Sequence, residues 1–169
     1  MSSPVQRLAI VLSFFTASLV AGTANASENA TRLLLKQGYE LAYNLDHDEA
    51  VAVMTQAIEN APNDPATYRA VAAISWLRIL FLRGGILVDN YLAGTGSAIS
   101  RGRRKTQKPP EDLAEAFKFH IERAIELAEK AVDRTPADPD AHFELGTSVA
   151  LAASYKSSIE GDSLRALRD

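Results

Sequence analysis

A short proline motif constrains the fold of this chain more than any other feature, because it occurs twice. Residues 62–65 read Pro-Asn-Asp-Pro, and residues 136–139 read Pro-Ala-Asp-Pro. Each copy follows an amphipathic segment, so the first proline of the motif is expected to end one helix and the second to begin the next. The repeat therefore predicts helices joined by tight turns and packed as antiparallel hairpins.

The stretch from Asn44 to Tyr68 shows the pattern most clearly. Its apolar residues recur at helical spacing and form one stripe: Ala50, Val53, Met54, Ala57 and Ile58. Either Asp46 or Asp48 is expected to cap the start of this helix. A second helix type recurs around a small residue, since a shift of 108 positions places Gly38 on Gly146.

Composition supports one helical globular domain. The chain has 169 residues, of which 47% are hydrophobic and 23% are charged, as in ordinary folded proteins. Aromatic residues make up only 7%, and Gly and Pro are few. We therefore expect an all-α fold with almost no strand.

Residues 1–26 have the organisation of a secretory signal peptide. Arg7 provides a positive start, Leu8–Val20 is an apolar run, and Ala24-Asn25-Ala26 has the small-x-small form of a cleavage site. The alternative is an uncleaved anchor helix, but the apolar run is short for a membrane span. We expect cleavage near Ala26 and a periplasmic or secreted protein.

Charge and cysteine content exclude several classes of site. The formal net charge of −3 becomes −4 without residues 1–26, which gives no electrostatic reason to expect nucleic acid as a partner. The chain has no cysteine, so it forms no disulfide, thiolate metal site or thiol nucleophile.

Residues 31–64 resemble a tetratricopeptide repeat, which is 34 residues long. The small residues and the proline of that motif are matched by Gly38, Ala50, Ala57 and Pro62. The departures are Leu34 at the usual Trp, Leu45 at the turn Gly and Met54 at an aromatic position. The resemblance implies an α-solenoid of stacked antiparallel helical hairpins that binds another protein.

If 34 residues are taken as one unit, the chain after residues 1–26 divides into about two and a half units, the second of them enlarged. The predicted units are repeat one at 31–64, an expanded repeat two at 65–138 with a loop at 93–110, and a partial repeat three at 139–169. An array of this kind needs about three repeats to bury its faces. We expect either that the chain is a fragment or that another subunit, as in a homo-oligomer, covers its last face.

The resemblance also implies a concave groove lined by the first helix of each hairpin. The groove positions are Arg32, Leu35, Tyr39, Tyr43, Arg69, Ala73, Trp76, Phe143 and Thr147. Two arginines beside aromatic residues suit a peptide or protein partner with an acidic group and apolar side chains. For Leu35 and Phe143, burial in the core is the equal alternative.

The expansion of repeat two offers a second candidate surface. Its basic loop contains Arg101, Arg103, Arg104, Lys105 and Lys108, and the preceding run from Trp76 to Val88 is apolar on most faces. These features suit a peripheral envelope protein that contacts anionic lipid, although a solvated loop and a buried helix explain them as well. If Arg78 is buried in that run, it requires a carboxylate partner.

No catalytic, cofactor or metal site is expected. His47, His120 and His142 are far apart in the sequence, and no hydrolase or metal-binding motif accompanies them. We therefore predict that the chain is not an enzyme by itself. A third interpretation makes it the part of a larger enzyme that holds the substrate.

Overall fold

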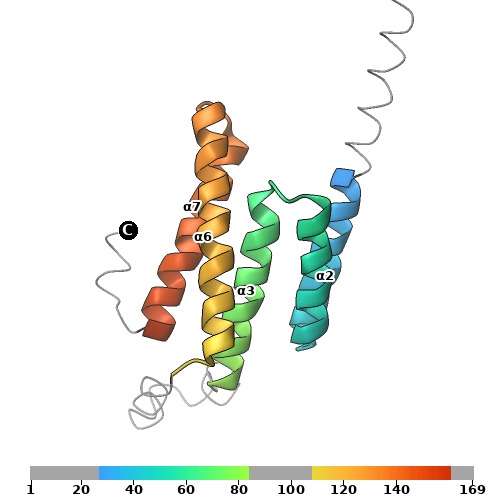
Figure 1. Cartoon of the computed structure of the whole chain (residues 1–169), viewed down its shortest axis with the longest axis vertical. Helices are drawn as coiled ribbons and strands as arrows, with labels where there is room; N and C mark the ends of the chain where they lie inside the picture. The colour runs from blue at the N-terminus through green and yellow to red at the C-terminus, as the bar shows by residue number, and fades with distance from the viewer. Residues whose placement is uncertain (1–26, 84–107, 161–169) are drawn as a thin grey trace, which may run out of the picture.

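The computed structural model describes residues 27–83 and 108–160 (Figure 1). Within these ranges, residues 27–43 are helical, and four further α-helices and a short π-helix follow. These are α2 (His47–Asn60), α3 (Pro65–Leu82), α6 (Glu111–Arg134), α7 (Pro139–Tyr155) and the π-helix η1 (Lys156–Glu160). The described residues contain no strand, which confirms the all-α prediction.

The repeated proline motif starts a helix at both of its occurrences. The Asp64 carboxylate accepts a hydrogen bond of 2.9 Å from the Ala66 amide, and the helix begins at Pro65. The Asp138 carboxylate accepts an equivalent bond of 3.0 Å from the Asp140 amide at the start of α7. An aspartate cap followed by proline satisfies the exposed amides of the first turn and fixes the backbone angle there.

The start of α2 differs from expectation. Asp46 occupies the capping position, but its side chain makes no capping hydrogen bond. Asp48 lies one residue inside the helix and forms an ion pair with Arg78 of α3, with 3.4 Å between Oδ2 and Nη2. The partner that Arg78 requires therefore comes from the preceding helix, and the side chain remains partly exposed.

Small residues allow the first two helices to pack closely. A Cβ atom at Gly38 would lie 2.7 Å from Cε and 2.8 Å from Cγ of Met54, so any side chain there would force this buried methionine to move. Ala50 and Ala57 are also completely buried. These residues bring the first two helices close together at Gly38.

The helix over residues 27–43 ends in a Schellman motif. The Asp46 amide donates to the Leu41 carbonyl at 3.0 Å, and the Leu45 amide donates to the Ala42 carbonyl at 3.1 Å. Leu45 adopts a positive φ of 70°, a conformation that glycine adopts without cost and leucine does not. The departure from the repeat's turn glycine therefore places leucine in a strained position.

Replacing this residue by glycine should stabilise the protein. We expect Leu45→Gly to raise the free energy of unfolding by about 0.5–1 kcal/mol, because relief of left-handed strain outweighs the added freedom of the unfolded chain. Tyr43→Gly is the control, since Tyr43 is an exposed last residue of the helix with helical backbone angles, where glycine costs up to about 1 kcal/mol. Urea unfolding measures both changes, and a loss of stability in Leu45→Gly would contradict the argument.

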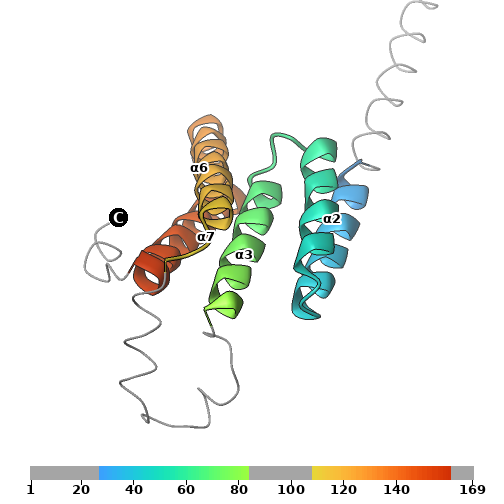
Figure 2. The same cartoon turned by 60° about the horizontal axis from the view of Figure 1, so that its bottom comes forward.

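A second core joins α3, α6 and the end of the described chain. Phe117 of α6 stacks on Tyr155 of α7, with ring centroids 3.9 Å apart and an interplanar angle of 11°. Ile79 of α3 and Ile159 of η1 are buried in the same cluster. Helix α3 thus packs against α2 on one side and against α6 and α7 on the other (Figure 2).

The predicted burial of the apolar run is only partly observed. Ile79 is buried, whereas Phe81 and Leu82 at the end of α3 are exposed. Arg83 follows the helix, and its Nη1 donates to the Ile159 carbonyl at 3.3 Å. A cation thereby lies at the C-terminal end of η1, where it also complements the helix dipole.

Candidate functional site

Three helices that begin successive predicted units contribute to one polar cluster. Arg69 of α3 forms an ion pair with Glu144 of α7, in which Nη2 lies 3.3 Å from Oε1 and Nη1 contacts Oε2. The same Nη1 donates to Thr147 Oγ1 at 2.5 Å. Both members of the ion pair are partly buried, and the pair joins α3 to α7.

Tyr39, from the helix over residues 27–43, lies in the same electrostatic environment. Burial raises the pKa of Tyr39 because it disfavours the phenolate; Arg69 opposes this and Glu144 adds to it. The residue nevertheless keeps 45% of its surface exposed. Tyr39, Arg69 and Thr147 were each predicted as groove residues, and here they lie near one another.

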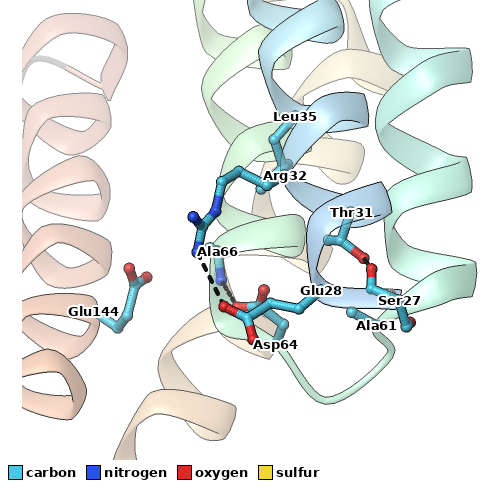
Figure 3. A pocket seen from close by; sticks show the side chains of 9 residues that line it. All are labelled: Ser27, Glu28, Thr31, Arg32, Leu35, Ala61, Asp64, Ala66 and Glu144. Carbon is cyan, nitrogen blue, oxygen red and sulfur yellow. Dashed lines mark hydrogen bonds and ion pairs between the residues drawn. The ribbon is translucent and has the colours of Figure 1, made fainter. Parts of the chain in front are cut away.

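A cavity of about 560 Å³ opens beside this cluster (Figure 3). Its walls are formed by Ser27, Glu28, Thr31, Arg32, Leu35, Ala61, Asp64, Ala66 and Glu144. Glu28, Arg32 and Asp64 lie on one side of the opening, and Glu144 lies on the other (Figure 3). The cavity therefore lies between the start of the described chain and α7.

The polar groups of the cavity already have partners within the chain. Arg32 Nη2 donates to Glu28 Oε1 at 3.0 Å, one helical turn away. Thr31 Oγ1 donates to the Ser27 carbonyl at 2.9 Å. The exposed Arg32–Glu28 pair gains little free energy and is easily exchanged for another partner.

The other predicted groove residues occupy different environments. Leu35 lines the cavity and also packs, partly buried, against the first core cluster. Ala73 is half-buried on α3. Tyr43 and Phe143 are exposed, at 89% and 62%, so Phe143 is not a core residue. Trp76 packs against the second core cluster and donates from Nε1 to Ser158 Oγ at 2.9 Å.

Three acidic residues of the site were not predicted from the sequence. Glu144 holds Arg69, while Glu28 and Asp64 line the cavity. The sequence could have indicated Glu144 as a site residue, since it lies between the predicted groove residues Phe143 and Thr147. Glu28 has the same kind of signal, because it precedes Arg32 by one helical turn.

The histidines have separate environments. His47 is buried against Phe81, with ring centroids 5.9 Å apart, and burial lowers its pKa, with help from Arg78. His120 contacts the Ala116 carbonyl through Nδ1 at 2.7 Å. His142 is exposed, and its Nε2 lies 2.8 Å from the Pro136 carbonyl. The part of the chain that the structure describes contains no group of three metal-binding side chains.

Several sequence predictions lie outside the described residues. These are the leader 1–26, most of the loop 93–110 with Arg101, Arg103, Arg104 and Lys105, and the last residues of the partial repeat. Lys108, the remaining cation of the basic loop, is exposed. Within residues 27–83 and 108–160, no helix has the length and apolar character needed to cross a membrane.

Comparisons with known proteins give no relative of this chain. Protein-family models, curated proteins and solved structures were compared with it, and no match was found in any of the three. The family resemblance and the site therefore rest on the residues and contacts of this chain alone.

Proposed function

We propose that this protein is an exported helical-repeat module that binds an extended segment of a partner protein. The groove would run over the helix of residues 27–43, α3 and α7, which are the first helices of the three tetratricopeptide-like units. Support for the repeat register comes from Gly38 against Met54 in the first unit and from the identical caps that begin α3 and α7. Export rests on the sequence of residues 1–26.

The observation that carries this proposal is an open cavity lined by helices that also carry exposed aromatic side chains. The cavity is bordered by three separate helical segments, so a bound segment would contact all three units. Tyr39, Tyr43 and Phe143 expose large rings at positions expected to line the groove. Exposed aromatic residues beside a pocket are typical anchors for a protein partner, because they bury much area at low entropic cost.

Two exposed phenylalanines allow a matched test. Phe143 on α7 is 62% exposed and belongs to the proposed groove. Phe119 is 64% exposed and lies on α6, the second helix of its predicted unit, which is outside the groove. A peptide would first be selected with the full chain from an array of randomised sequences, and its affinity would then be measured by titration. We expect Phe143→Ala to weaken binding by about tenfold and Phe119→Ala to leave it unchanged.

The outcome separates a groove from a non-specific apolar surface. Equal losses in the two variants would show that any exposed ring suffices. Failure to select a peptide at all would overturn the proposed function. Thermal unfolding of both variants is the control for folding, since truncating a largely exposed ring should change stability little.

A further inference from the structure

The contact between the start of α2 and the end of α3 contains a buried histidine. His47 is the first residue of α2, and only 8% of its surface is exposed. Its ring lies against Phe81 of α3, with ring centroids 5.9 Å apart. Neither residue lines the cavity of the candidate site, so this contact is separate from the proposed groove.

We propose that this contact is sensitive to acid, because protonation of His47 weakens the packing of α2 against α3. A neutral imidazole packs against an aromatic ring as an apolar side chain does, whereas an imidazolium places a full charge in the same position. No group among the described residues forms a hydrogen bond or an ion pair with the His47 ring. The charged form would therefore be buried without a direct partner.

The charges that act on His47 come from two elements of the described chain. Arg78 of α3 opposes a second positive charge. Asp48 and Asp46, at the start of α2, favour one, but the Asp48 carboxylate is already paired with the Arg78 guanidinium, with 3.4 Å between Oδ2 and Nη2. The first turn of a helix also carries a partial positive charge, which disfavours a cation there. Burial and Arg78 outweigh the two aspartates, so the pKa of His47 lies below its ordinary value of 6.5.

The direction of this pKa shift determines the direction of the pH effect. Between the ordinary pKa and the lowered one, the unfolded chain binds a proton on His47 and the folded protein does not. Acid therefore shifts the equilibrium toward the unfolded form. The stabilisation is complete above about pH 6.5 and is lost as the pH falls toward the pKa of the folded protein.

Urea unfolding of the full chain at about pH 7.5 and about pH 5.5 tests the proposal. Between these two conditions, the folding equilibrium constant of the wild type should fall at least about twofold more than that of His47→Gln, whose side chain does not titrate. His142→Gln is the matched control, because it removes an exposed histidine of α7 and should keep the pH dependence of the wild type. Equal pH dependence in the wild type and in His47→Gln would overturn the proposal.

An NMR titration of the wild type keeps the test independent of how well the variant folds. The midpoint of the His47 ring should be lower in the folded protein than in the same chain unfolded in urea. Arg78→Gln should raise the folded midpoint, because it removes the opposing guanidinium and frees the Asp48 carboxylate. A merely structural role of Arg78 would change stability without moving this midpoint. A folded midpoint at or above the unfolded one would overturn the proposal.

A double-mutant cycle connects the pH effect to the contact between the two helices. The cycle compares His47→Gln, Phe81→Ala and the double variant, and it gives the coupling between the two rings. We expect this coupling to be smaller at about pH 5.5 than at about pH 7.5, because the protonated ring packs less well against Phe81. A coupling that does not decrease in acid would overturn the role of this contact.

Discussion

Gly38→Val is expected to lower the free energy of unfolding by about 2–3 kcal/mol. A Cβ atom added at this position would lie 2.8 Å from Met54 Cγ, and valine would add two further methyl groups beside the completely buried Met54. Met54 cannot move away without disturbing its neighbours in the first core cluster, so the added volume appears as strain. Urea unfolding followed by circular dichroism measures the change.

Gly146 provides the matched control, since the repeat pattern gives it the same position as Gly38. Apart from its chain neighbours and the nearby backbone of its own helix, no atom of the described residues lies within 4 Å of a Cβ atom added there. Gly146→Val should therefore leave stability nearly unchanged, because no contact is compressed. Combining Gly38→Val with Met54→Ala should cost less than the sum of the two changes, and strict additivity would contradict the packing argument.

Phe117→Ala is expected to destabilise the protein by about 3–5 kcal/mol, the range for removing a buried aromatic ring. Phe117 is buried and stacks on Tyr155, so truncation leaves a cavity between α6 and α7. Such a loss is a large fraction of the stability of an ordinary domain. The unfolding midpoint in urea should fall accordingly.

Phe119, two residues further along α6, is the internal control for this substitution. Its ring is 64% exposed and contacts His120 edge-on, with centroids 5.0 Å apart. We expect Phe119→Ala to change the free energy of unfolding by less than about 0.5 kcal/mol. Similar losses for both phenylalanines would show that α6 does not pack through the Phe117 face.

The surroundings of the expected groove residues were predictable only in part. The family resemblance named Arg69 and Thr147 as groove positions, and the structure brings the two side chains within hydrogen-bonding distance. The sequence did not show that Glu144 would occupy Arg69, because the two residues are 75 positions apart. Their pairing depends on how α3 and α7 lie against each other, and hydrophobic periodicity does not specify that arrangement.

Local sequence was sufficient for the starts of α3 and α7, because capping and proline chemistry act within a few residues. Asp64 and Asp138 begin their helices as the motif predicts. It failed at Asp48, whose carboxylate was a candidate cap and instead meets Arg78 from another helix. A carboxylate near a helix start can form either a weak capping hydrogen bond or a stronger ion pair with a guanidinium. The guanidinium comes within reach only when the helices pack against each other.

The sequence by itself determined the class of fold, since the recurring Asp-Pro caps and the apolar stripes act through local backbone geometry and burial. The tertiary structure decided which of two equivalent glycines is required. Gly38 has Met54 against it and Gly146 has open space, although the predicted repeat places the two glycines at equivalent positions. The physical reason is that close packing is a property of two surfaces in contact, and the sequence of one helix specifies only one of them.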